Sequence, residues 1–448
     1  MFILRNILTP LQDEFKHSRK GLERGTWFIY TLLAVITHFT SSRTSNLIRC
    51  LQTLFGVPLC PHRFYTFMAS PKLPWERLWT VLWSLIPQPT IDGRLLLALD
   101  DYINPKTGKK IFGCAPFFDH AAKINQAKYP WSQNVVSIGL LKIVKGRWAC
   151  LPLAFRFYHM KKTIEAGNVK IDRKSVLFQS KFEQAVEMLS KVAAAFHNTP
   201  LLIVTDTWFG NNGLFKPMRE SIGQHCHILS RLRVNASLFD LPRQRRKHQR
   251  GRPNKYGHKI GSATTLAEQF IKYATTYSIN LYGKQRDVLA YDRIVMLKTL
   301  KSAVRVVWVY RKSNWVALVT TDLDLSVEQI IEYYGARWKI ESGFKEIKQE
   351  IGSAKTQTRN PHAVTNHLNF CMMATTVTWL YADHLEHTPQ RCYAVNNRQH
   401  FAFSDVRKLI TQAALNKDFV TVCPNLGKPT QNTFRGLCTS LALSCYNL

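Results

Sequence analysis

The chain has 448 residues, 46% of them hydrophobic, so it can bury a large core and form about two to four domains. It carries 61 Lys and Arg residues against 29 Asp and Glu residues, a formal net charge of +32. This excess excludes a typical metabolic enzyme and predicts a polyanionic partner, most simply nucleic acid. A membrane surface or an acidic protein is less favoured, because no segment has the pattern of an amphipathic anchor.

The ten cysteines form no CxxC pair, so a zinc ribbon is not expected. No signal peptide is visible, and we therefore predict reduced thiols and a cytoplasmic protein. The apolar run from Trp27 to Phe39 is interrupted by Thr31 and Thr37 and is too short to span a bilayer. It predicts a core helix and no membrane partner.

Residues 1–89 are basic and have helix-like apolar spacing at residues 12–24, 27–40 and 44–55, with a Trp-rich stretch at residues 75–85. The pattern predicts a helical domain. Its charge favours a DNA-binding role over a purely structural packing role, and both interpretations stay open.

From residue 90 the pattern changes to alternating strands and helices. A buried strand at residues 94–99 ends in Asp100 and Asp101, and strands follow at residues 135–144 and 148–157. A helix at residues 175–196 precedes a buried strand at residues 201–204 that ends in Asp206, and a helix at 213–222 and a strand at 227–234 complete the series. Such α/β order places a site at the carboxyl ends of central strands.

A loop at residues 242–259 has no hydrophobic periodicity and is rich in Arg and Lys. Its Gly-Arg-Pro segment around Arg252 is similar to arms that enter a DNA minor groove, although a charge run is usually a solvated surface. Strands are then predicted at residues 294–297, 304–310 and 315–320, so residues 236–321 have the character of a β-rich insertion.

Residues 330–351 are predicted to form a helix, with its start near Ser326 and its end at Gly352. An apolar stripe of this helix would face the core, and Lys339, Glu346 and Glu350 would face solvent. The stripe consists of Tyr333, Ile340, Phe344, Ile347 and Ile351. A flank beside it presents Tyr334, Arg337, Glu341 and Lys348. An ordinary amphipathic surface helix is the alternative interpretation.

Three carboxylate positions therefore stand out: the Asp100–Asp101 pair, Asp206 and Glu341. Mg²⁺ prefers hard oxygen ligands, and a few carboxylates with substrate phosphate suffice to bind it. Two such ions can activate a water or a 3′-hydroxyl and stabilise the leaving oxygen of an in-line displacement. The pattern therefore predicts metal-assisted phosphoryl transfer, although a strand-end Asp is more often a turn cap.

The spacing Tyr-x2-Arg-x3-Glu-x6-Lys resembles the signature of bacterial DDE transposases of the insertion-sequence-four group. Here it is Tyr334, Arg337, Glu341 and Lys348. The surrounding RWKIE, the following Lys345 and Gly352, and the segments LALDD (97–101) and VTDTWFGN (204–211) add to the resemblance, which spans about residues 95–352.

The resemblance implies an α/β fold with a ribonuclease-H-like catalytic core at residues 90–235 and 322–385. The β-rich insertion at 236–321 interrupts this core, the helical region at 1–89 precedes it, and a C-terminal region at 386–448, with no assigned role, follows. It also implies cut-and-paste transposition of an insertion sequence in the bacterial cytoplasm, in association with the nucleoid. The partners would be double-stranded DNA at the terminal inverted repeats and the target, and a second protomer in a synaptic complex.

In that family, carboxylates bind two Mg²⁺ ions, for which Mn²⁺ can substitute. The resemblance assigns this role to Asp100 or Asp101, Asp206 and Glu341. It assigns phosphate binding near the cut end to Tyr334, Arg337 and Lys348. Lys345, which adds to the resemblance, and Arg252 of the basic loop are further candidates for DNA binding. Tyr102 follows the Asp pair where the family often has a small hydroxyl residue, so both acids stay candidates, with Asp100 favoured.

Many members of that family flip a base onto a Trp. Trp308 and Trp315 are candidates here, although a core position is the favoured prediction for both. Two other functions stay open for the chain: a catalytically inactive DNA-binding descendant of such an enzyme, and a structure-specific nuclease of the same fold class.

Overall fold

The computed structural model describes residues 2–17, 20–38, 41–120, 122–242, 252, 254–281, 283–311, 314–393 and 400–416. Most of the predicted basic loop, residues 243–251 and 253, lies outside the described residues. Part of the predicted C-terminal region, residues 394–399 and 417–448, also lies outside them.

Five strands form the centre of the protein in the order β4–β3–β1–β7–β8. Their bounds are β1 (Leu95–Pro105), β3 (Trp131–Val144), β4 (Arg147–Tyr158), β7 (Leu201–Thr205) and β8 (Cys226–Arg231). β3 is antiparallel to both β1 and β4, whereas β7 and β8 run parallel to β1. The run from Leu95 to Leu99 is fully buried, as expected of a strand covered on both faces. This mixed α/β arrangement is compatible with a DDE nuclease fold.

The predicted end of the first strand at Asp100 and Asp101 is wrong, because β1 continues to Pro105. β3 is long enough to pair with β1 along this whole extension, with Asp100 opposite Ser137. On its other side β1 loses its partner β7 after Leu99, which lies opposite Thr205. Asp100 therefore lies one residue beyond the parallel pairing, at the carboxyl edge of β7.

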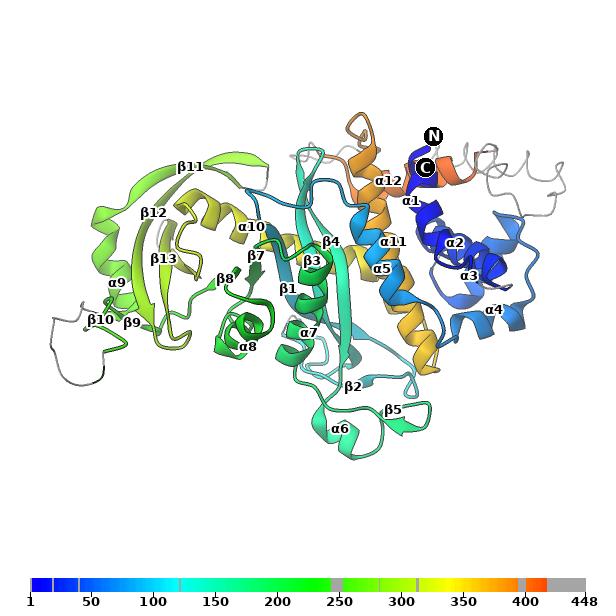
Figure 1. Cartoon of the computed structure of the whole chain (residues 1–448), viewed down its shortest axis with the longest axis horizontal. Helices are drawn as coiled ribbons and strands as arrows, with labels where there is room; N and C mark the ends of the chain where they lie inside the picture. The colour runs from blue at the N-terminus through cyan, green and yellow to red at the C-terminus, as the bar shows by residue number, and fades with distance from the viewer. Residues whose placement is uncertain are drawn as a thin grey trace.

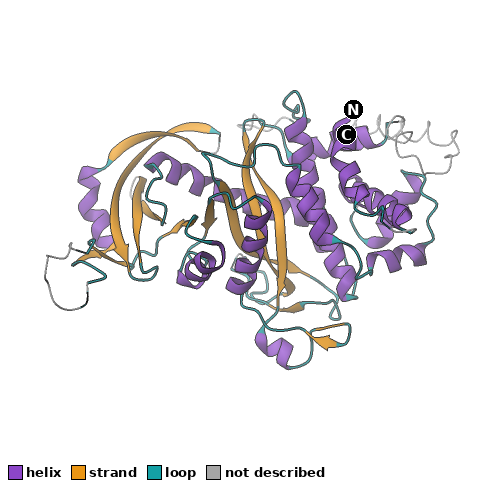
Figure 2. Ribbon diagram, in the orientation of Figure 1, coloured by secondary structure: helices purple, strands orange, loops and turns teal. Residues whose placement is uncertain are grey.

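The strands that follow β8 continue the same sheet rather than forming a separate one (Figure 2). β14 (Asn314–Thr320) pairs with β8, and the sheet continues through β13 (Ser302–Arg311) and β12 (Lys284–Leu297). β11 (Thr275–Leu281) and β9 (Ser237–Phe239) both pair with β12, and β10 (Lys259–Ser262) pairs with β9. The short helix α9 (Ala263–Phe270) accompanies them. On the other side β2 (Cys114–Pro116) pairs with β3, and β5 (Lys170–Ile171) and β6 (Lys174–Ser175) form a separate hairpin after α6 (Lys161–Glu165).

Helices cover both faces of the central strands. In Figure 1, α7 (Lys181–Ala195) and α8 (Asn212–Ile222) lie in front of the strands, and α10 (Val327–Lys345) passes behind them. α7 begins later than predicted because Ser180 and Glu183 form a capping box there. α10 packs against β1, β3, β4, β7, β8 and β14, which include β1 with Asp100 and β7, which ends just before Asp206.

The N-terminal region is helical and packs against a helix from the other end of the chain (Figure 1). Its helices are α1 (Phe2–Asp13), α2 (Gly21–Thr37), α3 (Thr44–Thr53), α4 (Pro61–Met68) and α5 (Trp75–Ser84). The predicted helix at residues 12–24 is wrong, since α1 ends at Asp13 and α2 begins at Gly21. Phe28 lies 5.1 Å from Phe370 between ring centroids, and Trp75 donates a hydrogen bond to Asn366. Both partners belong to α11 (Pro361–His384), and α12 (Phe403–Ala414) packs beside it.

Among the described residues, none of the helices combines the length and the apolar character that crossing a bilayer requires.

Candidate active site

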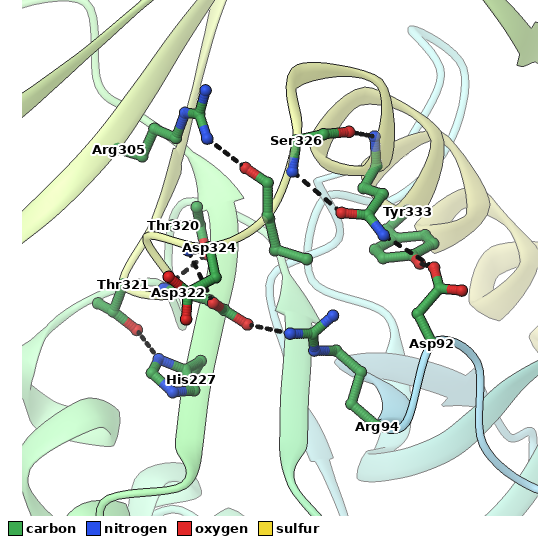
Figure 3. Close-up of polar contacts among 12 residues, drawn as sticks. Asp92, Arg94, His227, Arg305, Thr320, Thr321, Asp322, Asp324, Ser326 and Tyr333 are labelled. Carbon is green, nitrogen blue, oxygen red and sulfur yellow. Dashed lines mark hydrogen bonds and ion pairs between the residues drawn. The ribbon is translucent and has the colours of Figure 1, made fainter.

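The start of α10 is fixed to the amino end of β1. Ser326 caps the helix in a box with Gln329, as a Ser three residues before a Gln predicts. Gln329 also donates to Asp92 at 2.9 Å, and the Tyr333 hydroxyl donates to the same carboxylate. These contacts, drawn in Figure 3, set the position of the helix along the sheet.

The segment between β14 and α10 is held by a second group of polar contacts (Figure 3). Arg94 pairs with Asp322 at 3.1 Å, and the Asp322 side chain also accepts the backbone N–H of Asp324. Thr321 bonds to His227 on β8, with 3.4 Å between the hydroxyl oxygen and Nδ1. These contacts therefore connect β1, β8 and the segment that precedes α10 at this end of the sheet.

The predicted apolar stripe of α10 is confirmed, since Tyr333, Ile340, Phe344, Ile347 and Ile351 are all buried. The helix continues into a π-helical turn, Glu346–Glu350, and ends at Gly352, whose φ of +85° suits glycine.

The prediction that Glu346 faces solvent is wrong. Its side chain is buried and accepts a hydrogen bond from Trp379 Nε1 at 3.0 Å, because α11 covers this side of α10. Burial raises the pKa of Glu346 to about 7.

Arg337 joins the helix to the first predicted acid. Its guanidinium donates to Asp100 at 3.2 Å and to Glu341, one turn along α10, at 3.0 Å. The Arg337 side chain is buried, so these charge-assisted bonds satisfy a cation that would otherwise be costly in the interior. The contact brings Asp100 and Glu341 to the two sides of one guanidinium.

Asp206 completes the group from the end of β7. Its Oδ1 accepts the backbone N–H groups of Trp208 and Phe209, both at 3.0 Å, so the turn after the strand fixes the carboxylate. The pKa of Asp100 is raised to about 7, first by burial and then by the negative charge of Asp206. Two carboxylates that disfavour each other's ionisation in this way suit a cation between them.

Asp101 belongs to a different environment. Its carboxylate pairs with Lys181 of α7 at 2.8 Å and accepts a hydrogen bond from Asn134 at 2.8 Å. Successive residues of a strand point to opposite faces, so Asp100 faces α10 whereas Asp101 faces α7. The geometry therefore places Asp100, rather than Asp101, beside Arg337.

Tyr334 lies beside Arg337, whose guanidinium carbon is 5.7 Å from the ring centroid. Burial raises the pKa of Tyr334, while the charges of Arg337 and Arg231 lower it and that of Asp206 raises it. Arg231, the last residue of β8, is therefore close to the site. Sequence reasoning missed this residue, although its place at the carboxyl end of a strand next to β7 was a usable signal.

Lys348 lies in the π-helical turn, with its amine 5.4 Å from the centroid of the Tyr102 ring. Burial lowers the pKa of Lys348, and the nearby charge of Asp119 opposes this shift. Lys345 is exposed and lines a different hollow, with Arg147, Glu346 and Glu350. Arg252 is exposed too. In the part of the chain that the structure describes, neither Lys345 nor Arg252 makes an ion pair with the three carboxylates.

The two candidate base-stacking tryptophans differ in exposure. Trp308 is fully buried and donates to the Ala263 carbonyl at 3.0 Å, so the prediction of a core position is confirmed for it. Trp315 is half-buried in β14.

The donor set suits a hard divalent ion, since Asp100, Asp206 and Glu341 offer only carboxylate oxygens. Within the described residues, however, no three Asp, Glu, His or Cys side chains lie close enough together to hold a metal ion. The Arg337 guanidinium stands between Asp100 and Glu341 and donates a hydrogen bond to each. Metal binding by all three carboxylates therefore needs the Arg337 side chain to move out from between them.

Comparison with known proteins identifies the family. No curated protein matches the chain. The family described as DDE superfamily endonuclease matches residues 40–286, which is more than half of the chain. The matched segment holds Asp100, Asp101 and Asp206, and it ends before α10. The chain therefore belongs to the DDE superfamily endonuclease family.

Proposed function

We propose that this protein is a DNA transposase that cuts DNA at the ends of its element and joins the freed 3′-hydroxyl to a target. The observation that carries the proposal is the Arg337 bridge. It brings Glu341 of α10 to Asp100 of β1, beside the Asp206 charge at the end of β7. The net charge of +32 supports DNA as the substrate.

Members of this family generally use divalent metal ions. In our proposal Asp100, Asp206 and Glu341 hold two Mg²⁺ ions, and Mn²⁺ can replace them. Such ions would activate the attacking oxygen and stabilise the leaving one. The backbone N–H groups of Trp208 and Phe209 hold Asp206 in one orientation for this role.

The basic and phenolic groups of α10 would bind the DNA phosphates. Once Arg337 leaves the carboxylates, its planar fork can take a phosphate in two parallel hydrogen bonds, which Lys cannot do. Tyr334 offers a hydroxyl donor beside Arg337, and Lys348 offers a point charge in the π-helical turn that follows α10. Lys345 and Arg252 would contact DNA outside this cluster.

The finer parts of the proposal come from the resemblance to the insertion-sequence-four group. They are the cut-and-paste pathway at terminal inverted repeats and a homodimer that pairs two ends. The division into a DNA-binding region at 1–89, a catalytic core at 90–235 and 322–385, an insertion at 236–321 and a C-terminal region at 386–448 is part of the same proposal.

The test is cleavage and strand transfer on linear DNA that carries the inverted repeats flanking the coding region, with Mg²⁺ or Mn²⁺. Asp206→Asn and Glu341→Gln should abolish both reactions while DNA binding is kept. Asp101→Asn is the matched control and should keep most of the activity. Wild-type rates in the first two variants would refute the catalytic assignment. DNA binding without any cleavage by the wild type would identify an inactive binding protein, and preference for branched junctions a structure-specific nuclease.

A further inference from the structure

A hollow of about 790 Å³ opens directly beside the Asp206 loop. Three segments that are distant in sequence line it. They are the turn after β7 from Thr207 to Asn211, the chain that leaves β8 at residues 231–237, and the end of β12 at residues 297–299, with Lys259 of β10 at the rim. We call this hollow the β8–β12 groove.

The groove is positively charged. Its basic side chains are Arg231, Arg233, Lys259 and Lys298, and no acidic side chain is among its described lining residues. All four are exposed, and within the described residues none of them pairs with a carboxylate. Another basic hollow, beside Lys345, has the acidic residues Glu346 and Glu350 in its lining.

One of these cations is held in place by aromatic rings. The Lys298 amine lies 4.1 Å from the Phe239 ring centroid and 5.4 Å from that of Tyr256. Cation–π contacts of this kind restrict a flexible lysine without neutralising its charge. Asn235, Thr207 and Thr299 add neutral hydrogen-bonding groups to the wall. The groove therefore combines fixed positive charge with neutral donors, the chemistry that contacts a phosphodiester backbone.

The groove is continuous with the candidate active site. Thr207, in its wall, directly follows Asp206, and Arg231, at its near end, lies close enough to Tyr334 to influence its hydroxyl. β8, which ends in Arg231, packs against α10. The groove therefore begins directly beside Asp206.

We propose that the β8–β12 groove binds the phosphodiester backbone of DNA next to the cut site. This inference rests on the proposed function, since it extends the path of the DNA from the same carboxylates. Four cations spread over separate segments suit a chain of phosphates better than one small anion. Each contacted phosphate releases counterions, so the groove contributes both to affinity and to its dependence on salt.

The experiment compares two variants with the same loss of charge. The groove variant carries Arg233→Gln, Lys259→Gln and Lys298→Gln, and leaves Arg231 beside the site unchanged. The control carries Lys170→Gln, Arg173→Gln and Lys174→Gln in the exposed hairpin of β5 and β6, which lies below the core and away from β9, β10 and β12 (Figure 1).

Binding of a labelled random-sequence DNA duplex is measured against KCl concentration. We expect the slope of log affinity against log salt to become shallower by roughly 2–3 in the groove variant, about 0.9 for each lost contact. The control should change it by less than about 1. Equal slopes in the two variants would overturn the proposal. If the triple variant does not fold, as judged by its thermal melting, Arg233→Gln alone should still lower the slope by about 0.9.

The assay separates the groove from the proposed reaction, because binding to a random duplex needs no cleavage. If the wild type cleaves DNA ends but the groove variant keeps the wild-type salt slope, only the proposal for the β8–β12 groove is refuted. If the wild type never cleaves DNA but the groove variant has the shallower slope, the transposase proposal is refuted and DNA binding by the groove is supported. Displacement of the DNA by poly-glutamate as readily as by unlabelled duplex would overturn the assignment to nucleic acid.

Discussion

The parallel pairing of β1 with β7, which runs from Leu95 to Leu99, has opposite charge arrangements at its two ends. At the amino end Asp92 accepts hydrogen bonds from Gln329 and Tyr333, and Arg94 pairs with Asp322 (Figure 3). At the carboxyl end the Asp206 charge and burial together raise the pKa of Asp100 to about 7. Paired charges at the amino end stabilise the fold. At the other end Asp100 also pairs with Arg337, but burial and the Asp206 charge outweigh this contact, so the ionised Asp100 carboxylate is kept at a cost in stability. Such a cost is typical of a site that binds a ligand.

Helix α10 connects the two ends. Tyr333 contacts the amino-end cluster, and Arg337, one turn further, contacts Asp100. The contacts at the amino end therefore determine where Arg337 and Glu341 lie relative to Asp100 and Asp206. Substitutions at the two ends can be tested separately.

The largest expected effect is on catalysis at the carboxyl end. Asp100→Asn should reduce cleavage of end-bearing DNA by about a thousandfold or more, because it removes a charged oxygen ligand. Asp101→Asn should lose less than about tenfold, since Asp101 is paired with Lys181 and Asn134. Single-turnover cleavage in Mg²⁺ measures both, and the reverse order would assign the ligand role to Asp101.

The next largest effect is on stability at the amino end. Asp322→Ala should lower the free energy of unfolding by about 3 kcal/mol, because it removes a buried carboxylate and leaves the half-buried Arg94 guanidinium without its partner. The neighbouring Asp324→Ala changes an exposed side chain and should stay within about 0.5 kcal/mol. Urea unfolding of both variants provides the comparison, and similar losses would contradict the pairing argument.

At the carboxyl end, removing a charge should have the opposite effect on the free energy of unfolding. Asp100 has a pKa raised from 3.8 to about 7, so its contribution to stability is complete below 3.8 and is lost as pH rises through about 7. Without divalent metal, Asp100→Asn should therefore stabilise the protein by about 2 kcal/mol near pH 8. Chemical unfolding in chelator tests this, and a destabilised variant would show that Asp100 is not under electrostatic strain.

The smallest effect concerns His227 at the amino end. Burial lowers the pKa of His227 below 6.5, although the Asp322 charge opposes this shift. Its contribution to stability is present above 6.5 and is lost as pH falls through the lowered pKa. His227→Gln should remove this part of the acid dependence of unfolding. An unchanged profile between the two proteins would exclude His227 as the titrating group.

Short-range signals in the sequence predict the strand and the helix ends that position the site. The buried run from Leu95 to Leu99, the cap at Ser326 and the stop at Gly352 each have a short-range physical cause, and the structure has all three. The helix break between Asp13 and Gly21 was missed, because apolar spacing continued across it.

What the sequence could not supply depends on partners that come from elsewhere in the chain. Asp100 and Asp101 are equivalent in sequence, and only the position of α10 on one face of β1 distinguishes them. Glu346 has the spacing of a solvent-facing residue, but Trp379 of α11 covers it. The β8–β12 groove likewise joins segments separated by many residues, and none of them is distinctive alone.

The central claim is that Glu341, which Arg337 holds apart from Asp100 in this structure, joins Asp100 and Asp206 in one metal site. The most direct test is Mn²⁺ binding, followed by electron paramagnetic resonance, in the wild type and in Glu341→Gln with the same already cleaved DNA end bound. We expect the substitution to weaken Mn²⁺ binding by about tenfold or more, although it leaves both Asp ligands in place. Equal Mn²⁺ affinity in the two proteins would contradict the claim.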